Sequence, residues 1–350
     1  MKTKELKDVI QEVMMGTADK GILEEMSFIA FDEGFLISYN DRIAVSSTLP
    51  EGEGDFACAV NAKDFINAVK CIRTKDTELI LEEGNLIITG GATEVTLPIT
   101  ESEKLKELYN SLSIENVIDN STEIPDNFND ILQKLSDLAS PNLNTFQGLS
   151  CVRFSKEFIE ATDGSRAGYS EVDMKVPKQG VYIQKYLIPS VIKFNPVAYF
   201  FDKEWCHFVN EFDSILSCRR SYPDSPFPEI KELHKQGSGK KLGSFKMTEE
   251  FKESIKDLSY FAEGLSKKEQ YITMEIKNNK VIFSSSGDKG KVITEIKVKY
   301  SGETIRFRVS GPYLPTVIVG DEITIYKNNI TCSDKDVLTI LAVKEDDVTH

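Results

Sequence analysis

The sequence is poor in the residues and motifs that build catalytic sites and metal sites. Its three histidines (His207, His234 and His350) are far apart, with no cysteine or carboxylate at metal-ligand spacing. Motifs for an activated serine, a zinc protease or a dinucleotide are absent. The stretch GSGKKLGS (237–244) has the wrong spacing for a phosphate loop. The sequence therefore predicts no catalytic residue, no metal and no cofactor.

Long apolar runs and paired cysteines are also missing. No segment approaches the roughly 20 apolar residues that span a bilayer. Residues 1–15 lack the apolar core of a signal peptide and predict an amphipathic helix. The six cysteines contain no CxxC pair, which indicates reduced, buried thiols. We therefore expect a cytoplasmic protein with no membrane partner.

Positive charge is scarce as well. The chain has 42 basic and 56 acidic residues, a net charge of −14. A protein with this overall field repels phosphate, so its whole surface cannot attract nucleic acid. One sheltered basic face is still compatible with the total. The positions of the lysines and arginines therefore matter more than their sum.

What the sequence does contain is a repeat. Six blocks of three short alternating strands recur, at residues 27–47, 77–99, 149–172, 197–219, 270–298 and 322–343. A helical pattern precedes each block, at residues 6–15, 62–73, 126–140, 184–195, 248–263 and 311–320. We interpret the chain as an α+β protein made of three copies of a domain with two helix-plus-sheet halves.

The domain boundaries follow from two segments between the blocks. Residues 100–125 and 227–244 are polar or broken by glycine and proline, which predicts linkers. The three domains then span 1–115, 116–238 and 239–350.

The stretch ATDGSRAGYS (161–170) is unusually small and polar for a segment between strands. Asp163 and Gly164 are typical turn residues, because Asp bonds its own backbone and Gly accepts a positive φ. Two interpretations are open at this point. The stretch is either a hairpin turn alone or a turn that also forms one wall of a binding site.

Several stretches, in their order along the chain, resemble one family. ATDGSRAGYS is preceded by LSCVRF (149–154) and followed by SYPDSPFPEI (221–230). The series ends with VKYSGETIRFRVSGPYLPTVIVG (298–320) and LTILAVKED (338–346). Together with the threefold repeat, they resemble the bacterial beta sliding clamp, the processivity subunit of the replicative DNA polymerase.

The resemblance implies a fold and a function. It implies three repeated DNA-clamp domains that assemble head-to-tail as a homodimer into a ring, with helices inside and sheets outside. Such a ring encircles duplex DNA without sequence preference and tethers DNA polymerase, the clamp loader and other proteins with a clamp-binding motif. It implies no catalytic activity, and a place in the cytoplasm of a bacterial cell or a phage-infected host.

The resemblance also implies three sets of site residues. The partner-peptide pocket comprises Leu149, Thr162, Gly164, Ser165, Arg166, Ala167, Pro228, Ile230, Leu341, Ala342, Val343 and Lys344. The DNA-binding set comprises Lys20, Lys63, Lys70, Arg73, Gln147, Lys178, Lys185 and Lys193. The dimer interface comprises Val95, Leu97, Tyr260 and Phe261.

Other interpretations of these features remain open. The lysines could simply solvate exposed helix faces, and LTILAV could be an internal strand. Tyr260 and Phe261 could belong to the core of the third domain. A structural or assembly ring without DNA is the alternative function, and an enzyme with an unrecognised site is a third. Ser165 and Ala167 replace the family's usual histidine and large aliphatic residue, which leaves the partner motif open.

Overall fold

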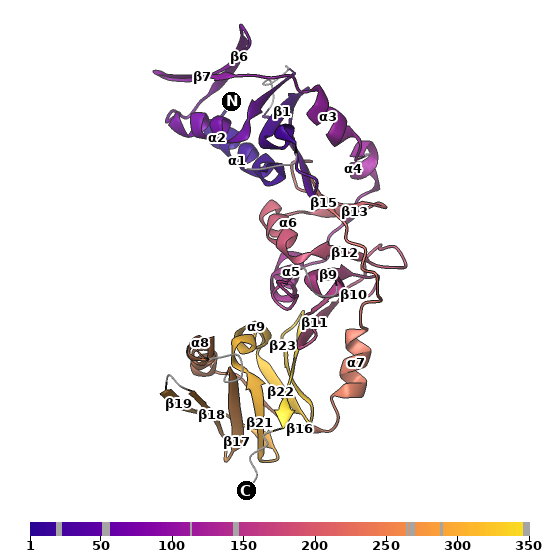
Figure 1. Cartoon of the computed structure of the whole chain (residues 1–350), viewed down its shortest axis with the longest axis vertical. Helices are drawn as coiled ribbons and strands as arrows, with labels where there is room; N and C mark the ends of the chain where they lie inside the picture. Colours follow the sequence, from indigo (N-terminus) through magenta and orange to yellow (C-terminus); the bar gives the residue numbers. More distant parts are fainter. Residues whose placement is uncertain are drawn as a thin grey trace. The chain divides into compact units, whose positions relative to one another are not determined.

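The computed structural model describes residues 1–18, 23–50, 57–112, 114–142, 147–263, 265, 270–287 and 290–345. The chain forms two compact units (Figure 1). Unit 1 contains Met1–Ile124 and Leu187–Arg220, and unit 2 contains Pro125–Tyr186 and Ser221–His350. No helix in the described part of the chain is long and apolar enough to cross a membrane.

Unit 1 is built on an eight-stranded antiparallel sheet with the order β4-β1-β2-β3-β15-β14-β13-β8. Its strands are β1 (Phe28–Asp32), β2 (Phe35–Tyr39), β3 (Ile43–Thr48), β4 (Cys58–Asn61), β8 (Thr122–Glu123), β13 (Ala198–Phe201), β14 (Trp205–Val209) and β15 (Ile215–Arg219). In the β3–β15 pair, Ser46 lies opposite Ile215. The first strand block and the fourth therefore share one sheet.

The second block forms a separate sheet in unit 1. It consists of β5 (Glu78–Glu82), β6 (Asn85–Gly90) and β7 (Thr93–Pro98), with β6 in the centre. The outer side of β7 pairs with no other strand that the structure describes.

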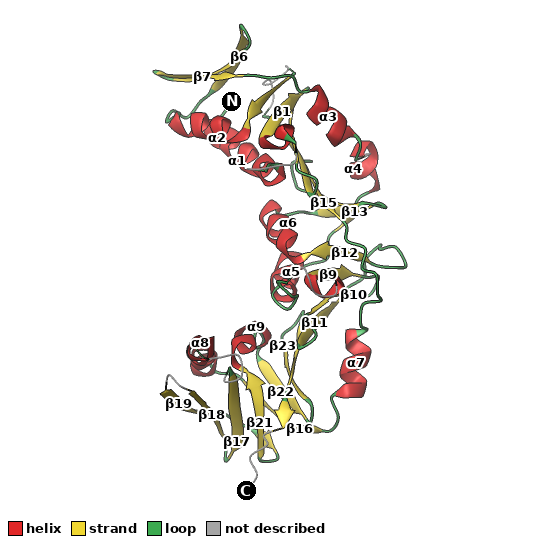
Figure 2. Ribbon diagram, in the orientation of Figure 1, coloured by secondary structure: helices red, strands yellow, loops and turns green. Residues whose placement is uncertain are grey.

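Helices cover both faces of the large sheet in unit 1 (Figure 2). On one side lie α1 (Thr3–Val13), α2 (Ala62–Cys71) and α6 (Ile188–Phe194), with the short helix η1 (Met14–Gly16). Helix α1 forms because Leu6, Ile10 and Val13 recur at helical spacing and are fully buried. The side chain of Asn61 caps α2 by accepting the backbone N–H groups of Lys63 and Asp64.

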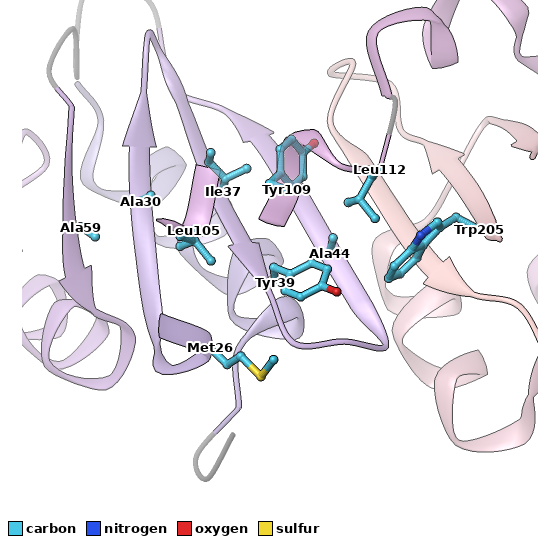
Figure 3. Packing of buried hydrophobic residues seen from close by; sticks show 10 residues of the cluster. All are labelled: Met26, Ala30, Ile37, Tyr39, Ala44, Ala59, Leu105, Tyr109, Leu112 and Trp205. Atoms are coloured by element: carbon cyan, nitrogen blue, oxygen red, sulfur yellow. The ribbon is translucent and has the colours of Figure 1, made fainter. Parts of the chain in front are cut away.

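The opposite face is covered by the segment that we expected to be a linker. It contains α3 (Glu103–Asn110), η3 (Ile114–Asn116) and α4 (Val117–Asn120), and η2 (Glu24–Ser27) lies near it. Leu105, Tyr109 and Leu112 are buried against Tyr39 and Trp205 in one cluster (Figure 3). The polar composition of 100–125 concealed an amphipathic helix, and that this segment links two domains stays a prediction.

Unit 2 is built on a nine-stranded sheet with the order β12-β9-β10-β11-β24-β23-β22-β16-β20. Its strands are β9 (Cys151–Phe154), β10 (Phe158–Thr162), β11 (Arg166–Glu171), β12 (Val181–Gln184), β16 (Lys241–Lys246), β20 (Ser301–Gly302), β22 (Glu322–Tyr326), β23 (Asn329–Ser333) and β24 (Leu338–Ala342). Here β11 pairs with β24, so that Gly168 lies opposite Thr339. The third block and the sixth therefore share this sheet.

A five-stranded sheet with the order β19-β18-β17-β21-β25 completes unit 2. It contains β17 (Tyr271–Lys277), β18 (Lys280–Gly287), β19 (Gly290–Lys297), β21 (Ile305–Ser310) and β25 (Lys344–Glu345). The helices of unit 2 are α5 (Phe128–Ser136), η4 (Gln147–Ser150), α7 (Ile230–Gly237), α8 (Glu249–Glu263), η6 (Gly311–Tyr313) and α9 (Leu314–Val317), and η5 (Lys185–Leu187) lies where the chain leaves the unit.

Helices α5 and α7 pack on opposite faces of the nine-stranded sheet. A Cβ at Gly168 would come within 2.5 Å of Leu138, just after α5, so this face of β11 lies against the α5 segment. Glu171, on the other face of β11, forms an ion pair with Lys231 of α7 at 2.7 Å. Glycine at 168 is therefore required by the close approach of the α5 segment.

The α+β class predicted from the sequence is confirmed: antiparallel sheets and helices occur in both units. Turn residues at the ends of the predicted hairpins adopt positive φ, among them Glu33, Asp41, Gly164 and Asn278. The division into domains at 1–115, 116–238 and 239–350 stays a prediction.

Candidate functional site

The turn from Thr162 to Arg166 is held by side-chain hydrogen bonds to its own backbone. The carboxylate of Asp163 accepts the N–H groups of Ser165 at 2.9 Å and Arg166 at 3.0 Å. The hydroxyl of Thr162 donates to the carbonyl of Arg166 at 2.7 Å and accepts the N–H of Gly164 at 3.0 Å. Gly164 has a φ of 90°, which only glycine adopts readily. The turn is therefore closely defined.

Arg166 is fixed from three directions. Its Nε donates to the Asp163 carboxylate at 2.9 Å, and its Nη1 donates to the hydroxyl of Thr316. The guanidinium carbon lies 4.3 Å from the centre of the Tyr313 ring. Only 8% of the residue is exposed. Arg166 therefore stabilises the wall around it, and its charge is largely balanced by Asp163.

Beside this turn lies a pocket of about 310 Å³. Nine residues that we predicted for the partner-peptide site line it: Leu149, Thr162, Gly164, Ser165, Arg166, Ala167, Pro228, Ile230 and Ala342. None of the described residues that line the pocket is acidic. The hairpin turn is thus also the wall of a concave, largely apolar surface, which is the kind of site that receives an apolar side chain of a partner.

Sequence analysis missed six residues of the pocket lining: Leu233, His234, Gly237, Asn328, Asn329 and Ile340. The first three belong to α7, in a segment that we had interpreted as a linker. The signal was present, since Ile230, Leu233 and His234 share one helix face by their spacing. Burial lowers the pKa of His234 below its ordinary value. Its Nδ1 lies 2.7 Å from the hydroxyl of Ser238.

Three predicted residues do not line the pocket. Leu341 is 1% exposed and lies opposite Arg166, on the face of β24 where Thr339 donates to the carbonyl of Val317 in α9. Alternate residues of a strand face opposite sides, so Ile340 and Ala342 face the pocket while Leu341 faces the core. Val343 is half-buried, and the Lys344 ammonium lies 4.2 Å from the centre of the Tyr271 ring in the five-stranded sheet.

The equivalent place in unit 1 is filled by two aromatic side chains. Tyr39 pairs with Ala44 there as Thr162 pairs with Ala167 in unit 2. Trp205 begins β14 and pairs with the last residue of β15, as Asn329 pairs with the last residue of β24. The Tyr39 and Trp205 rings lie 6.2 Å apart and both are buried (Figure 3). At the matching positions of unit 2, the smaller residues Thr162 and Asn329 line the pocket.

The predicted DNA-binding residues fall into three groups, of which the first is exposed, the second is not described and the third makes contacts in unit 2. Lys63 and Lys70 on α2, Arg73 after it and Lys193 on α6 are exposed in unit 1. Lys20 and the side chain of Gln147 lie outside the described residues. Exposed cations of this kind are the side chains that contact phosphates in protein–DNA complexes.

The third group consists of Lys185 and Lys178, for which DNA binding stays a prediction. The Lys185 ammonium donates to the carbonyl of Ala139 at 3.0 Å, at the end of the α5 segment, and burial lowers the pKa of Lys185. Lys178 lines a groove with Arg153 and Lys231, on the face of the sheet that α7 covers. Neither residue stands out on a helix face as Lys63 does.

The predicted interface residues differ in exposure. Tyr260 on α8 is 83% exposed, which rules out the interpretation that its ring belongs to the core. Phe261 and Val95 are half-buried, and Leu97 is buried. Both Val95 and Leu97 belong to β7, an outer strand of its sheet.

A buried chain of hydrogen bonds in unit 1 contains the residue types of a serine hydrolase. His207 Nδ1 lies 2.8 Å from the Ser217 hydroxyl, and Nε2 lies 3.1 Å from the Asp202 carboxylate. Burial raises the pKa of Asp202, but hydrogen bonds from His207 and from two backbone N–H groups outweigh it and lower that pKa. Both His207 and Ser217 are completely buried, so no substrate reaches this serine. These hydrogen bonds stabilise the pairing of β14 with β15.

The fold that surrounds these surfaces is that of the bacterial DNA polymerase sliding clamps. The beta subunit of the DNA polymerase of Streptococcus pyogenes superposes with a TM-score of 0.81 at 14% identity, over 99% of each chain. DNA polymerase III subunit beta of Borrelia burgdorferi, solved in complex with a natural product, gives 0.81 at 15% identity, over 99% of this chain and 98% of that one.

The DNA polymerase sliding clamp of Bacillus subtilis gives a TM-score of 0.80 at 16% identity, over 99% of this chain and 98% of that one. No protein-family profile and no curated protein sequence matches the chain. The resemblance inferred from the sequence is therefore confirmed for the fold, over nearly its whole length.

The alternation along β24 predicts losses of stability of different size at two neighbouring residues. Replacing Leu341 by alanine should lower the free energy of unfolding by about 2–5 kcal/mol, since it empties a buried site. Replacing Ile340, which is half-exposed at the pocket, should cost about 1 kcal/mol or less. Urea denaturation of both variants measures the difference. Equal losses would show that the strand register is wrong.

Proposed function

We propose that this protein is a sliding clamp, which encircles duplex DNA and tethers DNA polymerase to it. The observation that carries the proposal is the likeness to sliding clamps over 98–99% of both chains. The pocket beside Arg166 and the exposed cations of α2 and α6 add support from the residues themselves. In this role the protein holds enzymes on DNA in the cytoplasm of a bacterial cell or a phage-infected host and catalyses no reaction.

Two outer strands suggest how the ring closes. Neither β7 of the three-stranded sheet nor β19 of the five-stranded sheet has a further partner in the described part of the chain. Ile293 on β19 is 58% exposed. Unpaired strand edges with apolar side chains tend to pair with another chain. We propose that β7 of one copy pairs with β19 of a second copy, with Tyr260 near the contact.

The DNA-facing surface is the helical one. A net charge of −14 repels DNA at long range, so binding has to come from local cations and from topology. Lys63, Lys70, Arg73 and Lys193 supply such cations on helices of unit 1 or directly after one. Contacts of this kind with phosphates are sequence-independent and weaken with salt.

The pocket beside Arg166 is the proposed site for partner peptides. Its walls combine Leu149, Pro228 and Ile340 with the amides of Asn328 and Asn329. Apolar anchors in such pockets supply most of the binding energy of short peptides. We propose that DNA polymerase, the clamp loader and other clamp-binding proteins insert an apolar side chain here.

Retention on DNA tests the proposed function. The protein, loaded onto closed circular DNA by the clamp loader of its host, should co-elute with the circle in gel filtration. Linearising the circle should release it, because a ring held by topology slides off free ends. Equal retention on circular and linear DNA would contradict encirclement.

The dimer contact predicts the effect of two charged substitutions. Tyr260→Asp combined with Ile293→Asp should give folded monomers, since both side chains are exposed in the single chain. Light scattering measures the mass, and circular dichroism checks the fold. Phe212→Asp, at another exposed aromatic residue, serves as the control and should remain dimeric. A double variant that is still dimeric would remove β19 and α8 from the interface.

The peptide site predicts the effect of filling the pocket. Ala342→Trp places a large ring at an exposed position of the lining. Binding of a tail peptide from the host polymerase should weaken by roughly 30-fold or more, which corresponds to about 2 kcal/mol. Melting should change little, and Ala342→Ser should bind as the wild type does. Undiminished affinity of the tryptophan variant would exclude this pocket.

A further inference from the structure

A second concave surface in unit 2 is strongly basic. It has a volume of about 630 Å³ and lies where β16 leads into α8, beside the turn between β17 and β18. Its lining consists of Lys246, Met247, Thr248, Asn278, Asn279, Lys280, Lys297, Val298 and Lys299. Four of these are lysines, and no described lining residue is an acid. We call this surface the lysine pocket.

Two lysines of the pocket repel each other. Lys280 and Lys297 lie directly opposite each other on β18 and β19, and like charges in this position destabilise a sheet. Glu295 balances Lys280, with the two charged atoms 2.5 Å apart. No carboxylate among the described residues forms an ion pair with Lys246, Lys297 or Lys299. Lys297 and Lys299 therefore border the pocket without an ion pair from the described chain, whereas Lys246 lies opposite Glu322 in the β16–β22 pair without forming one.

The start of α8 contributes to the same surface. The helix has 15 residues, and Thr248 caps it by accepting the N–H of Phe251 at 3.2 Å. The N-terminal end of a helix carries partial positive charge. Glu249 follows in the first turn, but its carboxylate is turned to Lys252 at 3.3 Å. Glu250 also lies in the first turn, and Glu322 lies opposite Lys246. The described lining itself carries four positive charges and no negative one, although the chain as a whole carries a net charge of −14.

The residue types indicate the ligand. Lysine is a flexible point charge that suits phosphate groups. The pocket has no arginine for bidentate recognition of a base and no aromatic ring for stacking among its described lining residues. An acidic protein would need apolar anchors. Val298 is too buried to serve as one, which leaves Met247 as the half-exposed apolar side chain of the described lining. The chemistry favours a phosphodiester backbone bound without sequence preference.

We propose that the lysine pocket binds the phosphate backbone of nucleic acid. The proposal rests on the proposed function in so far as DNA is the partner that the clamp fold brings to this chain. The pocket is distinct from the cations of α2 and α6, which lie in unit 1, and from the peptide pocket beside Arg166. It gives the protein a second, non-topological contact with DNA.

A salt titration with a short duplex tests the lysine pocket. The full-length protein and the variant Lys246→Gln/Lys297→Gln/Lys299→Gln are titrated with a labelled linear duplex between 50 and 200 mM salt, and anisotropy gives Kd. Each phosphate contact contributes about 0.9 to the slope of log K against log salt. Loss of three contacts should therefore reduce the slope by about 2.7. An unchanged slope would overturn the proposal.

A matched control and a competitor sharpen the result. The variant Lys241→Gln/Lys327→Gln/Lys335→Gln removes the same charge from three exposed lysines outside the pocket and should keep the wild-type slope. If the control variant loses as much of the slope, the effect comes from net charge alone, and the assignment of the site is overturned. Polyglutamate that binds as tightly as the duplex, with the same dependence on the three lysines, would overturn the assignment to nucleic acid.

The outcome is separable from that of the proposed function. Retention on closed circles depends on topology, so the pocket variant should still be retained when loaded. A wild-type protein that is never retained, but whose duplex affinity depends on these lysines, would contradict the clamp and support the pocket. Normal retention on closed circles, together with a duplex affinity that does not depend on these lysines, would support the clamp and contradict the pocket.

Discussion

The structure depends on backbone pairing between strands that are distant in the sequence. In unit 1, β3 pairs with β15, and in unit 2, β11 pairs with β24. Each pairing joins two smaller sheets and removes two strand edges that would otherwise be exposed to another chain. The second pairing also brings Ala342 beside Ala167 and Arg166. Without it the pocket beside Arg166 would lack the wall that Ile340 and Ala342 form.

The same framework gives two different surfaces in the two units. The large rings of Tyr39 and Trp205 occupy unit 1 at the positions where Thr162 and Asn329 leave room in unit 2. In unit 1 these rings pack in a core cluster with Leu105, Tyr109 and Leu112, whereas in unit 2 the matching positions line a pocket. This is a local difference in packing on a shared sheet topology.

Local structure could be predicted from the sequence, because its causes are local. Strand alternation and turn residues such as Gly164 and Asn278 gave the hairpins, and apolar spacing gave α1 and α8. Helices α3 and α7 were missed, because their many charged residues concealed a narrow apolar face. The burial of Leu341 and the hydrogen bonds of Lys185 could not be predicted. The first depends on the strand register, and the second depends on carbonyl groups at the end of α5.

Charge placement links the proposed contacts with DNA. An acidic chain can bind DNA where cations gather locally, as in the lysine pocket and on α2. The central claim is that DNA passes through a ring made by two copies. Electron microscopy of the protein loaded on a nicked circle tests it most directly. The account predicts a closed dimer with duplex through the hole and α1, α2, α5, α6, α8 and α9 toward the DNA. Duplex bound on the outside of a monomer or an open assembly would contradict it.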